Sequence, residues 1–185
     1  IGDNTRYVTT SEPLSIWTIN GKIIFNGPVK FFYGTYVYVA FDACLTFGTN
    51  GTFVGCDTKI ICREAITIGN QVEITWENQI YDTSFHYIKD LEHPEETPKK
   101  LADPIVINDK VWIGNRTTIA KGSIIPSNSI IASNSMTNKD YTKYGENCIF
   151  AGMPAVCKKQ HVQRIFNYDE EAALDKVYNY IRYKL

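Results

Sequence analysis

The sequence predicts an all-β solenoid, a chain that makes a short strand, turns a corner and repeats along one axis. From Ile107 it reads INDKVW, IGNRTT, IAKGSI, IPSNSI and IASNSM, so an isoleucine returns every six residues. A helix favours apolar residues about 3.6 apart and a simple strand alternates every two, so a period of six fits neither. Three flat sides close a triangular coil of about eighteen residues, and neighbouring coils stack about 4.8 Å apart.

The segments before this repeat follow the same plan less regularly. Residues 13–41 are rich in aromatic and β-branched residues and contain Asn-Gly turns, so we expect them to form the first, irregular coils. A trace of the period surrounds Phe47 and Phe53. Five hexads (CDTKII, CREAIT, IGNQVE, ITWENQ and IYDTSF) follow, and we expect their leading residues to face inward and stack: Cys56, Cys62, Ile68, Ile74 and Ile80.

The fourth residue after each leading position is expected to point inward beside a corner, where only a modest side chain fits. These residues are Ile60, Ile66, Val72, Asn78 and Ser84 in the earlier set, and Val111, Thr117, Ser123, Ser129 and Ser135 in the later set. Gly, Asn, Asp and Ser residues between them supply the turns. A β-sandwich of short strands also shows closely spaced turns, but five unbroken hexads in one phase argue against it.

The two sets of hexads are out of phase, because Ile80 and Ile107 are 27 residues apart, which is not a multiple of six. The segment between them, about residues 86–105, is rich in proline and charged residues. It is too polar to bury, and proline breaks a strand ladder. We therefore expect a loop that leaves the coil, with His86 at its base and Asp82 on the last coil before it. Long loops on rigid scaffolds often carry function.

The tail DEEAALDKVYNYIRYKL changes to a helical period. Its apolar stripe consists of Leu174, Val177, Tyr178, Ile181 and Leu185. Acidic residues in the first turn and basic residues in the last turn also favour a helix. We expect this helix to pack on the solenoid or on a neighbouring subunit. The predicted organisation is a solenoid domain over residues 1–159 and a helical extension over residues 160–185.

Composition excludes several classes of function. The chain has 185 residues and a formal net charge of −1, without the basic face that nucleic-acid binding requires. No apolar stretch is long enough to insert stably in a membrane. Five cysteines without a CxxC pair indicate free thiols in a reducing compartment, so we expect a cytoplasmic protein; a thiol nucleophile is the alternative reading. The sequence begins at Ile1 without a methionine, so a fragment is one expectation.

The segments VWIGNRTTIAKGSIIPSNSIIASNSM and IFAGMPAVCKK carry a resemblance. Over residues 47–159 the chain resembles the hexapeptide-repeat acyltransferases. The stretch ITWENQIYDTSFH looks like the branch that contains cell-surface polysaccharide O-acetyltransferases, related to the galactoside and maltose acetyltransferases. The resemblance implies a left-handed parallel β-helix, a homotrimer, and acetyl-CoA as the acyl donor, with no metal required.

His86 is the candidate catalytic residue. A hydroxyl is a poor nucleophile at neutral pH, and imidazole is a natural acceptor for its proton. The resemblance implies that a histidine at the base of the loop is the general base, and we propose Asp82 as its orienting partner. The alternative is that His86 caps a turn and Asp82 begins one. His93 and His161 are expected to be solvated.

The resemblance also implies a binding site for coenzyme A in the groove between adjacent β-helices. The candidate residues are Trp112, Gly114, Asn115, Ala132, Ser133, Asn138, Lys139 and Lys159. Asn115 is further expected to stabilise the tetrahedral oxyanion, a contribution of roughly 3 kcal/mol in comparable sites. Relatives carry a Thr-Lys pair where this chain has Asn138 and Lys139. The candidate residues for the acceptor are Asp57, Trp76, Glu77 and Asp82.

These features predict an acetyl-CoA-dependent O-acetyltransferase that acts on a saccharide hydroxyl, in surface polysaccharide biosynthesis. One alternative is N-acetylation of an amino sugar nucleotide or of an antibiotic. A zinc enzyme of the β-helical carbonic anhydrase kind would need three histidines around the metal, and the spacing of the three in this chain does not match. A non-catalytic solenoid scaffold is the remaining alternative.

Overall fold

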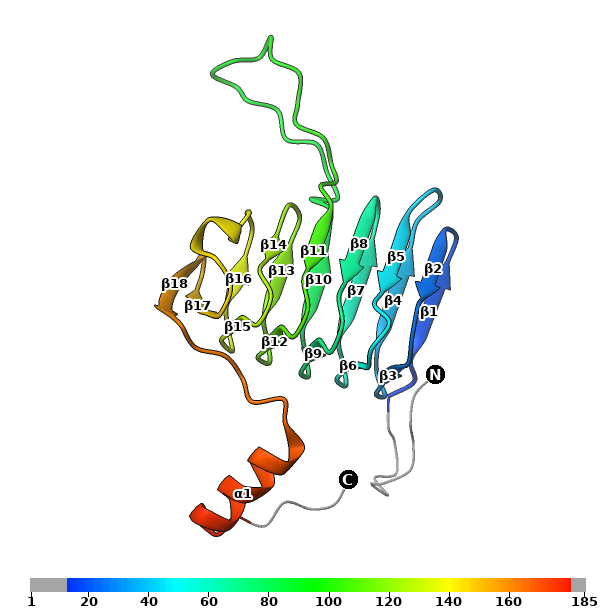
Figure 1. The fold of residues 1–185 in the computed structure, drawn as a ribbon. Coiled ribbons are helices and arrows are strands. Elements are labelled where there is room, and N and C mark those ends of the chain that lie inside the picture. The colour runs from blue at the N-terminus through cyan, green and yellow to red at the C-terminus, as the bar shows by residue number, and fades with distance from the viewer. Residues whose placement is uncertain (1–12, 181–185) are drawn as a thin grey trace.

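The computed structural model describes residues 13–180, which form a β-solenoid of about six turns and a C-terminal helix (Figure 1). Three sheets of parallel strands make the sides of the solenoid. Sheet 1 contains β1 (Ile16–Ile19), β4 (Tyr36–Val39), β7 (Lys59–Cys62), β10 (Gln79–Tyr81), β13 (Thr118–Ala120) and β16 (Met136–Thr137). Sheet 2 contains β2 (Lys22–Phe25), β5 (Cys44–Phe47), β8 (Ala65–Ile68), β11 (Ile105–Ile107) and β14 (Ile124–Ile125).

Sheet 3 also contains the end of the solenoid. Its strands are β3 (Val29–Phe31), β6 (Thr52–Val54), β9 (Glu73–Ile74), β12 (Trp112–Ile113), β15 (Ile130–Ile131), β17 (Cys148–Gly152) and β18 (Ala155–Gln160). β18 pairs with β17 in the antiparallel direction, so the parallel stack ends there. A 3₁₀ turn, η1 (Thr142–Tyr144), precedes this hairpin. The solenoid predicted from the hexads is therefore confirmed.

The isoleucine repeat builds the core of the C-terminal coils. Ile107 pairs with Ile125, and Ile113 pairs with Ile131, each eighteen residues further along the chain. All four side chains are fully buried. The predicted corner residues Val111, Thr117, Ser123, Ser129 and Ser135 are buried as well. Stacking of identical side chains removes apolar surface from water at each turn. This burial stabilises the fold by about 25 cal/mol for each Å² of apolar surface.

The N-terminal coils are longer than the hexads predict. Val54 pairs with Ile74 and Ile60 with Ile80, twenty residues apart, and Val37 pairs with Ile60 over twenty-three. The extra residues lie at the corners and shift the phase. Consequently the prediction that Cys56 faces inward is wrong: Val54 fills that core position, and Cys56 is only half-buried.

The predicted loop leaves the solenoid between β10 and β11 (Figure 1). We call the edge between sheets 1 and 2 the loop corner; it includes residues 82–104, 121–123 and 138–140. The Trp76 corner is the edge between sheets 3 and 1, which includes residues 55–58, 75–78, 114–117 and 132–135. These two edges lie at opposite ends of the strands of sheet 1.

The C-terminal helix α1 spans Tyr168–Tyr178, within the tail for which a helix is predicted. Its N-cap is Asn167, whose side chain accepts hydrogen bonds from the N–H groups of Asp169 and Glu170, and acidic residues fill the first turn. No residue of α1 is buried, so its apolar stripe does not pack on the solenoid of the same chain. The stripe positions Ile181 and Leu185 lie outside the described residues.

Candidate functional site

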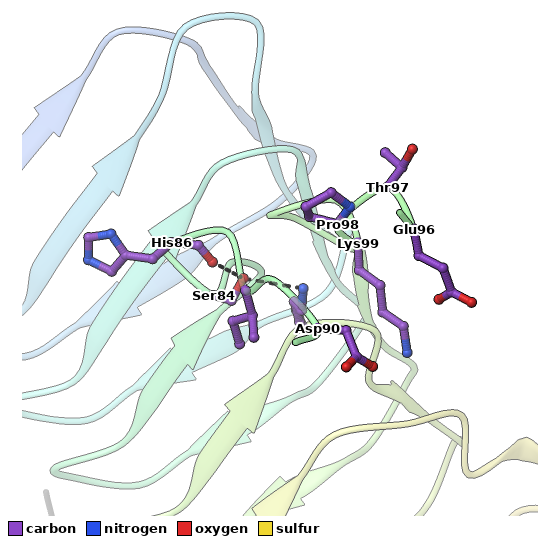
Figure 2. A pocket seen from close by; sticks show the side chains of 9 residues that line it. Ser84, His86, Asp90, Glu96, Thr97, Pro98 and Lys99 are labelled. Atoms are coloured by element: carbon purple, nitrogen blue, oxygen red, sulfur yellow. Dashed lines mark hydrogen bonds between the residues drawn. The ribbon is translucent and has the colours of Figure 1, made fainter. Parts of the chain in front are cut away.

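His86 lies where the chain leaves the loop corner. Phe85 adopts a left-handed conformation with φ 63°, and the His86 N–H donates to the Ser84 carbonyl at 2.7 Å. The tight turn therefore exposes the imidazole at the rim of the solenoid. Figure 2 shows the ring directed away from Asp90, Glu96 and Lys99 of the loop.

The two limbs of the loop are joined at their root. Thr83 forms an antiparallel bridge with Ala102, and the Ser84 N–H donates to the Leu101 carbonyl at 2.8 Å. The Asp103 N–H donates to the Asp82 carbonyl at 2.9 Å. The hydrogen bonds at the root hold the backbone that carries His86, although the loop beyond it is exposed.

Asp82 has partners other than the one that the sequence predicts. The side chain is fully buried, and its carboxylate accepts hydrogen bonds from the backbone N–H groups of Arg63, Glu64 and Ala65 at 2.7, 2.7 and 2.9 Å. Burial raises the pKa of the Asp82 carboxyl above its ordinary value, and these three donors partly offset the effect. The carboxylate thus anchors the loop root to the preceding coil, and its hydrogen bonds do not go to His86.

The Trp76 corner carries a column of polar side chains. Asp57, Glu77, Arg116 and Asn134 occupy equivalent positions in successive coils, each with a left-handed φ between 55° and 59°. The Glu77 carboxylate accepts a hydrogen bond from Arg116 Nε at 2.6 Å, across adjacent coils. Beside them Trp76 is 48% exposed, so its ring face is accessible to a ligand.

Asn115 is held on the same corner by the coil that follows. Ser133 Oγ donates to Asn115 Oδ1 at 2.6 Å, which leaves the Asn115 amide group to present its N–H donors elsewhere. Gly114 is needed for this close approach, because a Cβ there would lie 2.5 Å from the Ser133 nitrogen. Ala132 precedes Ser133, and its carbonyl accepts from Thr117 Oγ1 at 3.0 Å.

The predicted site residues therefore divide between two corners of one chain. His86, Asn138 and Lys139 lie on the loop corner, with Asn138 and Lys139 two coils away from His86, about 10 Å at the ordinary strand spacing. The Trp76 corner carries Asp57, Trp76, Glu77, Gly114, Asn115, Ala132 and Ser133. Residues 78–83 cross sheet 1 between the corners, roughly 20 Å at about 3.3 Å per residue.

Two predicted cofactor residues lie on sheet 3. Trp112 is half-buried, and the Arg164 guanidinium lies 5.9 Å from its ring centroid. Arg164 also forms an ion pair with Glu73 and stacks on Phe166, so the segment before α1 is fixed against the Trp112 region. Lys159 is exposed on β18. The spacing of the hexads gives no sign of this Arg164 contact.

A pocket of about 460 Å³ lies between the limbs of the loop (Figure 2). Its lining includes His86, the predicted catalytic residue, and also Ser84, Asp90, Glu96, Lys99 and Lys121. Apart from His86, sequence reasoning singled out none of these as functional, because the loop has no period and Lys121 is one of several lysines at corner positions. Within residues 13–180, no group of three or more His, Cys, Asp or Glu side chains is arranged to hold a metal ion.

The five cysteines are free thiols, as predicted. Cys62 and Cys148 are buried, whereas Cys44, Cys56 and Cys157 are half-buried. Burial, together with the nearby Asp82 carboxylate, raises the pKa of Cys62 to about 12. The described part of the chain has no helix with the length and apolar character needed to span a membrane.

Solved acyltransferase structures share this fold. A hexapeptide-repeat-containing acetyltransferase of Vibrio cholerae O1 biovar eltor, crystallised with acetyl coenzyme A, is 29% identical over 63% of this chain, with a TM-score of 0.52. The alignment covers 60% of that protein's own chain, less than two thirds of its length. This chain is thus similar to about 60% of the length of that acetyltransferase.

Two other structures match over a larger share of the chain. A variant of AntD, an N-acyltransferase from Bacillus cereus in complex with dTDP and coenzyme A, is 16% identical, with a TM-score of 0.63 over 89% of this chain and 83% of that one. The polysialic acid O-acetyltransferase OatWY is 22% identical, with a TM-score of 0.61 over 86% of this chain and 78% of that one. At these identities the likeness shows the fold alone.

No protein-family model matches the sequence, and no curated protein matches it. The fold and the solved neighbours nevertheless define the structural class. It is a hexapeptide-repeat β-solenoid of the kind found in acyltransferases, and the resemblance expected from the sequence is confirmed by these neighbours.

Proposed function

We propose that the chain is an acetyl-CoA-dependent acyltransferase that acetylates a hydroxyl group of a saccharide. The observation that carries the proposal is the exposed imidazole of His86, held by a paired loop root at the rim of a stiff solenoid. A solved neighbour with the same repeat is an acetyltransferase crystallised with acetyl coenzyme A. A base at a fixed position beside an open surface suits transfer between two bound substrates.

His86 accepts the proton of the acceptor hydroxyl as its oxygen attacks the thioester carbonyl. The new C–O bond forms, the C–S bond breaks, and the proton held by His86 returns to the leaving thiolate. No covalent acyl-enzyme is required, so none of the five thiols has a catalytic role. Asp82 stabilises the coil on which His86 stands, through its bonds to Arg63, Glu64 and Ala65.

The Trp76 corner has groups that fit an acyl donor. Asn115 has an amide oriented by Ser133 and stabilises the oxyanion that develops on the thioester carbonyl. Gly114 and Ala132 keep the corner narrow, so that an extended pantetheine arm can lie along successive coils. On the outer coils, Asn138 and the exposed lysines Lys139 and Lys159 provide hydrogen bonds and positive charge for the nucleotide phosphates, and Trp112 provides an apolar wall.

The division of these groups between two corners supports a homotrimer. His86 on one corner and Asn115 on the other are roughly 20 Å apart along sheet 1, too far to act on one carbonyl. In a closed ring of copies, the loop corner of one chain faces the Trp76 corner of the next. Each site then takes its base from one copy and its oxyanion donor from the other.

The acceptor is proposed to bind beside Trp76, whose exposed face offers a stacking surface for a sugar ring. Asp57 and Glu77 supply carboxylates for its hydroxyl groups. A free-thiol protein of this kind fits a cytoplasmic step that modifies a saccharide or a sugar nucleotide for a surface polysaccharide. Acylation of an amino sugar or of an antibiotic remains the alternative for the same site.

Turnover with a panel of acceptors tests the proposal. Purified protein, acetyl-CoA and neutral, acidic, amino and nucleotide-linked sugars are incubated, with aminoglycosides as a drug arm, and free CoA is measured. The His86→Ala variant is expected to lower kcat by about 10² to 10⁴, the usual contribution of a positioned general base. His93→Ala is the matched control, because His93 is an exposed histidine of the same loop, and its activity should stay near that of the wild type.

Near-normal acetylation by His86→Ala would contradict the assignment of the base. Acetylation confined to amines, and largely insensitive to His86→Ala, would favour the N-acetyltransferase alternative. Absence of acetyl-CoA binding by calorimetry would favour a scaffold without catalysis. Metal analysis of the same preparation tests the expectation that no metal is required.

A further inference from the structure

Lys121 connects the loop that carries His86 to the next coil. It lies on the loop corner between β13 and β14, directly above the point where the loop leaves the solenoid. Its ammonium group donates to the Lys100 carbonyl at 2.9 Å, to the Leu101 carbonyl at 3.2 Å and to Ser84 Oγ at 3.4 Å. A lysine ammonium has three N–H donors, and all three are directed to the root of the loop.

These contacts reach both limbs of the loop. Lys100 and Leu101 belong to the returning limb, whereas Ser84 belongs to the outgoing limb. Ser84 Oγ in turn lies 3.2 Å from the His86 carbonyl and 3.2 Å from the Leu101 carbonyl, and these two acceptors share its single O–H donor. Lys121 is therefore two hydrogen bonds away from the backbone of His86, through Ser84.

The loop root is held from two sides. Below it, the buried carboxylate of Asp82 is bonded to the preceding coil, and above it Lys121 belongs to the following coil. The residues beyond the root are exposed. The position of His86 thus depends on these two anchors together with the backbone bonds that join the two limbs and the Lys100–Glu64 ion pair of the returning limb.

We propose that Lys121 is a positioning residue for catalysis: its ammonium clamps the two limbs of the loop and fixes His86 through Ser84. This inference rests on the proposed function, because it assigns the purpose of the clamp to the base. A ring displaced by about 1 Å costs on the order of a hundredfold in rate when the base must meet its proton at hydrogen-bond distance. Lysine suits the role because its compact charge can donate to three acceptors at once.

Lys121→Met tests the clamp, since methionine keeps much of the length and removes all three donors. Lys121→Arg is the conservative variant, and it should recover part of the loss because it keeps the charge and the donors. Lys110→Met is the matched control, because Lys110 is exposed on the same coil but lies at the corner between sheets 2 and 3, away from the loop root. Thermal unfolding of each variant checks that the solenoid is intact.

Two measurements are compared. Hydrogen exchange at the amides of Ser84 and His86 should accelerate by about tenfold or more in Lys121→Met, as expected for loss of charged hydrogen bonds, and should stay unchanged in Lys110→Met. The kcat should fall by about tenfold to a hundredfold, with a change in KM for acetyl-CoA of less than about threefold. The shape of the pH profile should stay that of the wild type, because His86 remains the proton acceptor.

The outcomes separate this inference from the function on which it rests. Unchanged exchange at the loop root in Lys121→Met overturns the clamp, whatever the enzyme does. Faster exchange with an unchanged kcat overturns the positioning role and leaves the proposed function intact. An altered pH profile overturns it too, because Lys121 would then take part in proton transfer. If the wild type transfers no acyl group, the proposed function and the positioning role fall, and the exchange measurement still decides whether the clamp exists.

Discussion

His86 and Asp82 are four residues apart but lie in opposite environments. The imidazole is exposed at the rim, whereas the carboxylate is buried against three backbone donors of another coil. The spacing in the sequence favours a catalytic pair, as in a serine-hydrolase triad. In the structure the carboxylate instead stabilises the loop corner, because it accepts hydrogen bonds from the backbone N–H groups of Arg63, Glu64 and Ala65.

Cys62, at the end of β7 beside the loop corner, provides a test of how deeply this part of the solenoid is buried. Its pKa is raised to about 12, so at pH 8 only about one thiol in ten thousand is ionised, and the thiolate is the reactive form. We expect a disulfide reagent to modify the half-buried Cys44 and Cys157 of the folded protein and to leave Cys62 unmodified until the chain is unfolded. Mass mapping of the labelled peptides measures this.

Because the pKa of Cys62 is raised, we expect the folded state to lose stability at alkaline pH. The pKa of Cys62 is higher in the folded state than in the unfolded state, so its contribution to stability is complete below the unfolded pKa of about 9. That contribution is lost as the pH rises from there toward 12, and the Cys62→Ala variant should not show this part of the loss of stability.

In the labelling experiment, rapid labelling of Cys62 in the folded protein at pH 8 would show that the thiol is not buried as described.

At the scale of the strands and coils, stacking determines which side chains face inward. From Ile107 to Thr137 each coil has eighteen residues, so the sequence period and the register coincide. In the N-terminal half the coils have twenty or more residues, because the corners are longer. The hexad pattern therefore predicts the C-terminal core well and misplaces Cys56, since inserted corner residues change the phase without changing the composition.

An Ile113→Ala substitution measures what one stacked position contributes. Ile113 is fully buried between Ile74 and Ile131, and the flat strands around it cannot collapse into the space that it leaves. We expect the free energy of unfolding to fall by about 2–5 kcal/mol, determined by urea denaturation. Ile88→Ala is the matched control: Ile88 is 77% exposed, and its effect should stay within about 0.5 kcal/mol.

The loop can be predicted from the sequence, but the contacts of Lys121 that hold its root cannot. The phase break between Ile80 and Ile107 predicts that a loop leaves the coil beside His86, and the structure confirms it. Lys121 is not predictable in the same way, because its contacts join coils that are stacked in space and separated by the whole loop in sequence. The contact of Arg164 with Trp112 is of the same kind.

At the scale of the whole molecule, the residues proposed for the site divide between two corners of the chain. Sheet 1 separates the loop corner from the Trp76 corner. Tyr87, Ile88 and Leu91 extend from the loop as exposed apolar side chains, and the apolar side chains of α1 are also exposed. Apolar surface of this kind is usually covered in an assembly. These features agree with the proposal that copies of the chain associate and complete each site between them.

The central claim, that His86 of one copy acts with the Trp76 corner of the next, is tested most directly by mixing two inactive variants. One carries His86→Ala, and the other carries both Trp76→Ala and Asn115→Ala; each alone is expected to be nearly inactive. Assemblies that contain both variants, isolated through two different affinity tags, should recover about a third of the wild-type activity per chain, because a ring of three that contains both variants has one intact interface among its three. Mixed assemblies that stay as inactive as their parents would contradict the claim.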